Sequence, residues 1–461
     1  MSATPSSNPT NPTSSFSSKV GLVMAAAGSA VGLGNIWKFP YIAGQNGGGA
    51  FLIIYLLCVL AFGLPLLMTE FIIGKSSHKS AYGAFKHLCG NNKWQWLSWL
   101  SMLTAILIMG FYFIVTGWCV SYLVEALTDS FAALDTAQLT QHFKSVTSNP
   151  LRMITFSAIA LALTVAVVWF DVNKGIERLS KILMPLLLLM MILMAGRVLM
   201  LDGSTIGMRF FFQPDFSKVT GSTILVAMGQ AFFSLSIGMG ALITYGAYMP
   251  KSQNITTTSV QVVVLDTLVA ILAGLIIFPA VFAFNFNPAE GPELVFVVLP
   301  AIFGKMSFAW LSAVLFFTLL CIAAITSTIS LMEVSVAFFT EATANLRHPL
   351  NRHKSALVTA GLVMVLIVFS VLTMTGVLSI GKYSIFDILD QLTSCVLMPL
   401  GALGMAVFLG WFVKKDVRRN ALYPSHKNIA ARLWRFTFTM LIRFVVPVAI
   451  LIIFLNTFGI L

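Results

Sequence analysis

Charged residues are scarce in this chain of 461 residues: they make up 10% of it, whereas 58% of its residues are hydrophobic. A soluble globular chain is nearer to a quarter charged, so the composition excludes a water-soluble domain. The hydrophobic residues instead form long blocks, and those at 102–120 and 436–454 are each long enough to cross a bilayer. We therefore expect an all-α polytopic membrane protein.

Cysteine and histidine are also few, with five and six residues respectively. The cysteines are scattered without a CxxC motif, and every histidine lies outside the hydrophobic blocks. This distribution argues against a disulfide framework and against a haem or metal enzyme. The sequence also offers no nucleophile, base and orienting group at credible positions, so we expect a protein that is not an enzyme.

Acidic residues are outnumbered, 16 against 28 Lys and Arg, which gives a net charge of +12. With the N-terminus in the cytoplasm and the C-terminus outside, most basic residues fall in inner segments, as the positive-inside rule requires. The expected partners of this charge are the lipids of a cytoplasmic membrane, and not nucleic acid. Blocks and breaks together predict eleven transmembrane spans, at about 20–42, 48–74, 96–126, 152–170, 178–200, 220–248, 256–285, 306–340, 355–377, 385–413 and 434–458.

The first and sixth of these spans are interrupted by glycines and small polar residues, GSAVGLGN at 28–35 and SLSIGMG at 234–240. Glycine weakens a helix interior by about 1 kcal/mol relative to alanine, and unpaired main-chain groups in hydrocarbon cost several kcal/mol each. Close helix packing is an alternative explanation for one such stretch. Two matching stretches, five spans apart, favour a binding site at the midplane of an inverted repeat.

This interpretation divides the chain into four parts. Residues 1–18, rich in Ser, Thr, Pro and Asn, indicate a disordered cytoplasmic tail. Residues 19–200 form the first repeat with helices 1–5, residues 218–414 form the second with helices 6–10, and residues 432–461 form an eleventh helix.

Four motifs carry a family resemblance: AGSAVGLGNIWKFPY at 27–41, NGGGAF at 46–51, GQAFFSLSIGMG at 229–240 with ITYGAY at 243–248, and AAITSTIS at 323–330. With them the chain resembles the neurotransmitter:sodium symporter family over residues 19 to about 411. The resemblance implies the leucine-transporter fold, a 5+5 inverted repeat with discontinuous helices 1 and 6. It also implies sodium-coupled import of amino acids by alternating access.

The resemblance implies two sodium sites made of oxygen donors, which suit a hard cation. The first site is expected to use oxygens of Ala30, Asn35, Ser234 and Asp266. The second is expected to use oxygens of Gly28, Val31, Ala323, Thr326 and Ser327. Ordinary helix-packing hydroxyls are the alternative for Thr326 and Ser327.

Asp266 is informative without the family, because a carboxylate inside an apolar run is a functional candidate by default. A protonated Asp, or one paired within the bundle, is the alternative. In much of the family this position is Asn, and chloride or a nearby acid supplies the negative charge. We expect Asp266 to neutralise a sodium ion itself, and transport to need no chloride.

The substrate implied by the resemblance is an amino acid held at the two breaks. Its carboxylate is expected at the amides of Leu33 and Gly34 and the hydroxyl of Tyr112. The full set of expected contacts is Ser29, Ala30, Leu33, Gly34, Ile108, Tyr112, Phe233, Ser234, Ser236, Met239, Ser327 and Leu331. Since the side-chain pocket is apolar apart from two small hydroxyls, we expect a hydrophobic, large or aromatic substrate. Gly32 stands where monoamine transporters place an aspartate, which excludes monoamines.

The resemblance also implies two gates. The family's outer gate is an Arg–Asp pair, and the matching residues here are Lys38 and Asp390, so the charge is kept while the bidentate guanidinium is lost. Tyr248 and Glu341 match the inner gate. Glu70, on the second span, is expected to brace the interrupted sixth helix.

Near the N-terminus the chain departs from the family. The Arg and Trp of the family's inner latch fall on Thr13 and Phe16, a loss that Lys19 is a candidate to offset. Gly175 and Pro185 enclose nine residues, a pattern that in bacterial relatives lets the fifth helix unwind. Proline removes a main-chain donor and clashes with the preceding turn, so this segment is a candidate water path to the second sodium site.

An amino-acid-gated channel or sensor is the alternative function, because broken helices suit both classes. Paired gates on opposite sides favour alternating access. The oligomeric state is left open between a monomer and a weak dimer.

Overall fold

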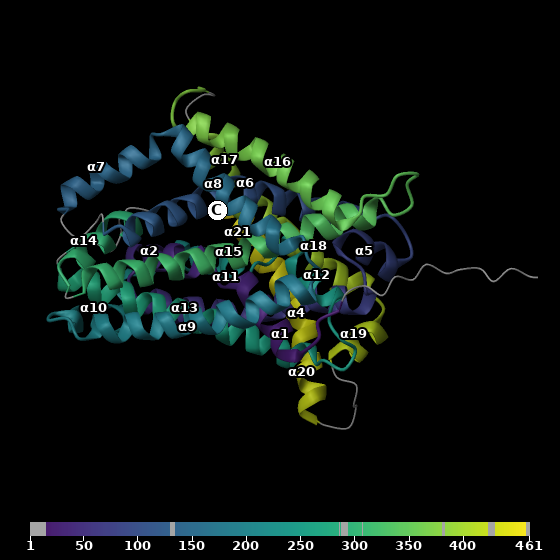
Figure 1. Ribbon diagram of the computed structural model, residues 1–461. Helices are drawn as coiled ribbons and strands as arrows, with labels where there is room; N and C mark the ends of the chain where they lie inside the picture. The colour runs from purple at the N-terminus through teal and green to yellow at the C-terminus, as the bar shows by residue number, and fades with distance from the viewer. Residues whose placement is uncertain are drawn as a thin grey trace, which may run out of the picture.

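The computed structural model describes residues 15–129, 134–284, 286, 294–306, 308–379, 383–422 and 429–457. Their regular elements are helices, packed into one elongated bundle (Figure 1). The first elements are α1 (Lys19–Ala30), η1 (Gly34–Lys38), α2 (Phe39–Gln45), α3 (Gly49–Cys58), η2 (Val59–Gly63), α4 (Leu64–Ser77), α5 (Ala81–Cys89), α6 (Gln95–Leu127), α7 (Thr136–Thr147), α8 (Pro150–Val168), η3 (Asn173–Glu177), α9 (Arg178–Leu199) and α10 (Ser204–Phe212). The remaining elements are η4 (Phe216–Lys218), α11 (Gly221–Ser234), α12 (Ala241–Ala247), α13 (Ile255–Ala283), η5 (Leu294–Val298), α14 (Leu299–Gly304), α15 (Ala309–Ala342), α16 (Arg352–Met374), α17 (Ile385–Gln391), η6 (Leu392–Leu397), α18 (Met398–Val407), η7 (Phe408–Phe412), α19 (Lys415–Leu422), α20 (Ile429–Met440), η8 (Leu441–Val445) and α21 (Val446–Thr457).

Nine helices of the described chain are long and apolar enough to cross a membrane, and the bent pair Lys19–Ala30 and Gly34–Gln45 makes ten if it is counted as one span. The all-helical, multi-pass class is therefore confirmed. The predicted span at 220–248 corresponds to α11 and α12, which have 14 and 7 residues and are each too short to cross alone. The count of eleven and the division into two repeats remain predictions.

Five of the π-helical turns, η1, η2, η5, η6 and η8, each end two residues before a proline. A proline has no N–H and its ring clashes with the carbonyl one turn earlier. A wider π turn at that place lets the helix continue past the proline. The prolines therefore deform these spans without ending them, and the breaks at the site have another cause.

The long helix α15 runs through the bundle and packs on α1, α6 and α9, while α12 packs on α4 and α10 packs on α13. Figure 1 shows α7, α10 and α14 at one end of the bundle and α5 and α19 at the other. These short helices were not predicted, because hydropathy over a span length detects only segments that cross.

Candidate functional site

The first interruption lies between α1 and η1, at 31–33, where the axis bends by 51°. The backbone packs closely at Gly32: a Cβ there would lie 2.4 Å from Ser327 Oγ and 2.7 Å from Tyr112 Oη, so both side chains would have to shift to admit a larger residue. The amide of Gly32 donates to Asn35 Oδ1 at 3.1 Å. A side chain thus takes the place of the helical partner that this amide lacks.

The second interruption lies between α11 and α12. Three of its residues have a positive φ: Ser236 (55°), Gly238 (92°) and Gly240 (78°). A Cβ on Gly238 would lie 2.2 Å from the carbonyl oxygen of Met398, so backbone packs on backbone here. Glu70 Oε1 accepts a hydrogen bond from the amide of Gly238 at 2.7 Å, in agreement with its expected bracing role.

Hydrogen bonds join the two interrupted helices directly. Ser236 Oγ donates to the carbonyl of Ser29 at 2.7 Å, and Gln230 Nε2 donates to the carbonyl of Gly34 at 2.9 Å. In both bonds the acceptor belongs to the first broken helix and the donor to the second. The prediction of two discontinuous helices, the first and the sixth, is confirmed.

Asp266 on α13 is fully buried, and its partners are neutral. Its carboxylate accepts from Asn35 Nδ2 at 2.7 Å and from Ser234 Oγ at 2.8 Å. Tyr55, which the sequence did not point to, donates to Ser234 Oγ at 3.2 Å, and Ala30 lines the adjoining central cavity. Within the described chain no Lys, Arg or His forms an ion pair with Asp266. Because a buried carboxylate without a counter-charge is costly, this cluster fits a bound cation.

The residues expected at the second sodium site also meet. Ser327 Oγ lies 3.2, 3.4 and 3.5 Å from the carbonyl oxygens of Val31, Gly28 and Ser29. One hydroxyl proton cannot satisfy three acceptors at once. Thr326 Oγ1 reaches the carbonyl of Ala323 at 3.1 Å, and a Cβ on Gly28 would lie 3.3 Å from Thr326. The surplus of oxygen acceptors again fits a hard cation.

Between the two interruptions lies a cavity of about 30 Å³. It is lined by Ser29, Ala30, Gly32, Gly34, Ile108, Tyr112, Phe233, Ser236, Met239, Ser327 and Leu331, none of which carries a charge. Of the expected substrate contacts, Leu33 and Ser234 are not among these lining residues. The amide of Leu33 instead donates to Tyr112 Oη at 3.0 Å, so two groups expected to hold a carboxylate satisfy each other in this conformation.

A wider cavity of about 130 Å³ lies on the other side of Tyr112 and Phe233, which line both spaces and separate them. It contains the expected outer gate. Lys38 Nζ lies 3.8 Å from Asp390 Oδ1 and 4.2 Å from the centre of the Phe233 ring. The ammonium thus closes the outer cavity over an aromatic lid.

At the inner end, Tyr248 and Glu341 bind other residues and not each other. Tyr248 Oη donates to Glu333 Oε1 at 2.9 Å, and the guanidinium of Arg352 binds both oxygens of Glu333, at 2.9 and 2.6 Å. Glu341 accepts from the amide and hydroxyl of Ser80 and lies 3.6 Å from Lys79. Glu333 was missed, although the argument made for Asp266 applies to it: it is a carboxylate inside the apolar run of α15.

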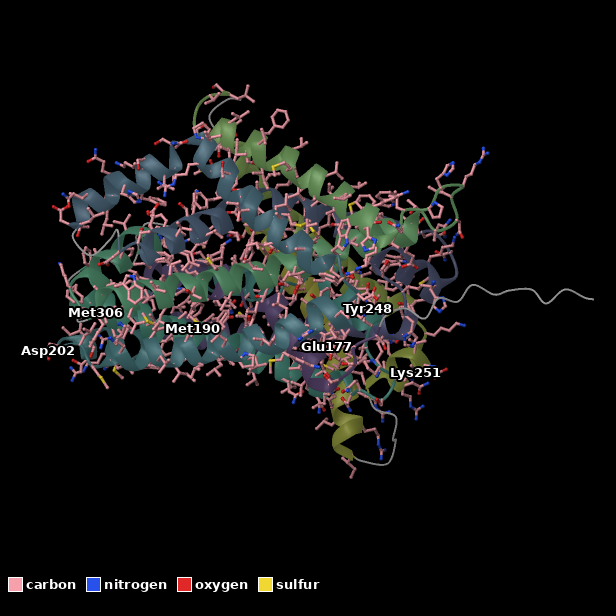
Figure 2. All side chains as sticks on the ribbon, in the orientation of Figure 1. Glu177, Met190, Asp202, Tyr248, Lys251 and Met306 are labelled. Atoms are coloured by element: carbon pink, nitrogen blue, oxygen red, sulfur yellow. The ribbon has the colours of Figure 1, made fainter. Side chains whose placement is uncertain are left out.

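The start of α1 is held to η3 by Glu177. Its carboxylate accepts from the amide and hydroxyl of Ser17, each at 2.7 Å, and from the hydroxyl of Ser18 at 2.9 Å. Phe16 is buried against Tyr245 and Tyr248. Figure 2 shows Glu177 and Tyr248 at the same end of the bundle.

These contacts bear on the predicted tail and inner latch. Thr13 and the rest of residues 1–14 lie outside the described residues, so the predicted tail stays a prediction there. Residues 16–18, which the prediction included in the tail, are fixed by packing and hydrogen bonds. Serine hydroxyls and one phenyl ring thus hold this segment at the inner end, and the role of Lys19 stays a prediction.

The fifth predicted span is continuous in this conformation. η3 runs directly into α9, and Pro185 lies inside that helix. Gly175 touches the preceding helix, since a Cβ there would lie 2.3 Å from the carbonyl oxygen of Val167. The unwinding attributed to the Gly-x9-Pro pattern therefore remains a prediction about another conformation.

The described chain is a multi-pass helical bundle. Two interrupted helices enclose a cavity lined by main-chain polar groups, and charged groups close it toward both ends. This arrangement defines a membrane transporter. A model of the sodium:neurotransmitter symporter family matches residues 13–149 and 136–460. The chain belongs to this family, whose members are transporters and not enzymes, and it is a sodium-dependent transporter.

Similar proteins agree along nearly the whole chain. The chain is 40% identical over 452 residues to the uncharacterized sodium-dependent transporter YhdH of Bacillus subtilis (strain 168), covering 97% of this chain and 98% of the relative. It is 33% identical to an uncharacterized sodium-dependent transporter of Haemophilus influenzae, covering 96% and 97%. The crystal structure of MhsT in complex with L-phenylalanine superposes with a TM-score of 0.88 at 37% identity, covering 96% of this chain and 99% of that one.

Proposed function

We propose that this protein imports hydrophobic, large or aromatic L-amino acids together with two sodium ions, by alternating access and without a chloride requirement. The observation that carries the proposal is the uncharged cavity between the two helix breaks. Main-chain amides and carbonyls at these breaks suit a zwitterion, and the apolar lining leaves no partner for a charged side chain.

The substrate would replace contacts that the closed cavity makes with itself. Its carboxylate would take the hydrogen bond that the amide of Leu33 gives to Tyr112, and its ammonium group would face carbonyls near Ala30 and Ser236. A cavity of about 30 Å³ must widen to admit a large side chain. Met239 is suited to that change, because a thioether side chain adapts to several shapes. The L-phenylalanine bound to MhsT supports this substrate class.

Sodium would enter as a co-transported substrate at the two oxygen clusters. A tenfold sodium gradient supplies about 1.4 kcal/mol per ion, and about 100 mV adds about 2.3 kcal/mol per charge. Two ions with a zwitterion therefore provide about 7.4 kcal/mol, enough for a substrate gradient of roughly 10⁵. The charge of Asp266 removes the need for chloride.

The distribution of basic residues supports an N-terminus in the cytoplasm and a C-terminus outside. In this orientation the Lys38 gate faces outward and the Tyr248 gate faces inward. Because charged groups close both ends, the proposal favours a transporter over an amino-acid-gated channel.

Two measurements test the proposal. Thermal unfolding in the presence of each of the twenty amino acids, with and without sodium, should show stabilisation by Leu, Phe, Tyr or Trp that depends on sodium. Stabilisation by lysine or glutamate instead would overturn the substrate class. Counterflow in proteoliposomes should show labelled substrate accumulating against its gradient, which a channel cannot do.

A further inference from the structure

A separate cavity lies at the end of the bundle that holds Tyr248. It is open to the surface and has a volume of about 300 Å³, against about 30 Å³ for the central cavity. Figure 2 labels Lys251 at this end, on the side where Figure 1 places α19. Its lining is basic and neutral polar, with one alanine and no acid: Lys75, Ser76, Lys251, Ser252, Gln253, Asn254, Asn420 and Ala421.

The lining residues carry more hydrogen-bond donors than their present contacts use. Lys75 is half-buried, and its ammonium donates to the carbonyl of Gln253, which leaves two of its three N–H groups. The carbonyl of the Asn254 side chain caps α13 by accepting from the amide of Thr257 at 3.1 Å, so its NH₂ group is left for another partner. Within the described chain neither Lys75 nor Lys251 forms an ion pair with a carboxylate.

The cavity lies where membrane spans end. Lys75 precedes the last residue of the Gly49–Ser77 span by two positions, and α13 starts directly after Asn254. This is the level of lipid headgroups, where basic pockets between helices bind phosphate-bearing lipids. The neighbouring α19 adds Lys415, Arg418 and Arg419 against one acid, Asp416, and keeps the local charge positive.

We propose that this cavity binds a phosphate group, carried by an anionic membrane lipid or free in solution. A phosphate offers several acceptor oxygens to two ammonium groups and to the hydroxyl and amide donors between them. Bound there, it would tie α4, which carries the Glu70 brace, to the segment that joins α12 to α13. The inference stands apart from the transported substrate, because none of the lining residues belongs to the central site.

Binding is tested on purified protein stripped of lipid, by native mass spectrometry and thermal unfolding. The probes are short-chain phosphatidylglycerol, phosphatidylcholine with the same acyl chains, and inorganic phosphate. The charge-removing pair Lys75→Gln with Lys251→Gln is compared with Lys86→Gln and Lys354→Gln, which remove two exposed lysines outside the cavity. At about 1 kcal/mol per lysine, the cavity pair should weaken binding by about thirty-fold and the control pair should not.

The probes identify the source of the phosphate. If phosphatidylglycerol binds and only the Lys75→Gln, Lys251→Gln pair loses that binding, the ligand is a lipid. If inorganic phosphate is the only probe that gives this result, the ligand is free phosphate. Equal affinity of the two variant pairs for every probe would overturn the proposal. Asn420→Asp provides a second test in case the lysine pair misfolds. It places a negative charge on an exposed lining residue and should weaken binding, whereas Asn91→Asp, at an exposed residue elsewhere at this end, should not.

Discussion

Replacing Asp266 by Asn tests the proposed coupling most directly, since it removes the charge of the first oxygen cluster and keeps its shape. Asp266 is 0% exposed and accepts hydrogen bonds from Asn35 and Ser234 at 2.7 and 2.8 Å. Two opposite charges about 4 Å apart attract by about 4 kcal/mol at an effective dielectric constant of about 20. Desolvation offsets part of this, so we expect a net loss of about 1.5–3 kcal/mol.

That loss corresponds to a rise of roughly 10- to 150-fold in the sodium concentration that gives half-maximal stabilisation by substrate. The measurement is thermal unfolding with saturating substrate across a sodium titration, with choline as the replacement cation. Glu333→Gln is the matched control, because it neutralises another fully buried carboxylate that lies in the inner gate. It should lower stability and shift the sodium titration much less than Asp266→Asn does.

The same variant tests the chloride argument. Uptake by the unaltered protein should be nearly unchanged when gluconate replaces chloride, whereas Asp266→Asn should gain a chloride stimulation, because the anion can then supply the missing charge. An unshifted sodium titration in Asp266→Asn, or an equal shift in Glu333→Gln, would refute the assignment of Asp266. A large loss of wild-type uptake in gluconate would refute chloride independence.

Three further substitutions follow from the contacts around the site. Gly238→Ala should lower the unfolding temperature, because alanine at a φ of 92° costs about 1–2 kcal/mol and its Cβ would meet Met398. Glu177→Gln should lower the free energy of unfolding by about 1–3 kcal/mol, because it weakens the hydrogen bonds from Ser17 and Ser18. Since the start of α1 is then held less firmly, labelling of cysteine by a reagent added from the inner side should also rise. Lys38→Arg should slow substrate release to the outside, measured as dissociation of labelled amino acid, because a guanidinium can bind the gate carboxylate with two hydrogen bonds.

Each of these has a control of the same chemical type. Gly361→Ala, on an open helical surface, should be neutral or stabilising, and an equal loss at both glycines would contradict the packing argument. Asp416→Asn should leave inner labelling unchanged. Lys38→Gln should speed release; if it behaves like Lys38→Arg, the outer ion pair does not control dissociation.

Much of the site could be predicted from the sequence because its signals are local. The glycines of 28–34 and 234–240 mark helix breaks, since their cost in a membrane helix is general. All of the expected substrate contacts except Leu33 and Ser234 line the cavity, including Ile108 and Leu331 far from the breaks in the sequence. The contact between Tyr112 and Leu33 could not be predicted, because it depends on how far the cavity has closed.

The inner contacts were harder to predict, because they join residues far apart in the chain and use unremarkable residue types. Glu177 binds serines 159 and 160 positions away. Nothing marks Ser17 and Ser18 among the many serines of the N-terminal segment until the fold brings them to a carboxylate. Glu333 could have been identified as a carboxylate inside an apolar run. Its partner Arg352 could not, because it lies in a basic stretch that the positive-inside rule already explained.

The two gates differ in how firmly they close this conformation. The outer closure combines the aromatic lid of Tyr112 and Phe233 with one ion pair at 3.8 Å, whose side chains are 26% and 38% exposed. Such exposed pairs contribute about 0–1 kcal/mol. The inner closure contains a buried carboxylate bound by both arms of Arg352, and breaking a pair of this kind costs about 3–5 kcal/mol. The Glu177 bonds and the buried Phe16 add to it. In the orientation proposed above, we expect this arrangement to open outward more easily than inward. Inward opening would then require a further change, such as loss of sodium from the proposed second site, that weakens the packing of α1 on α15.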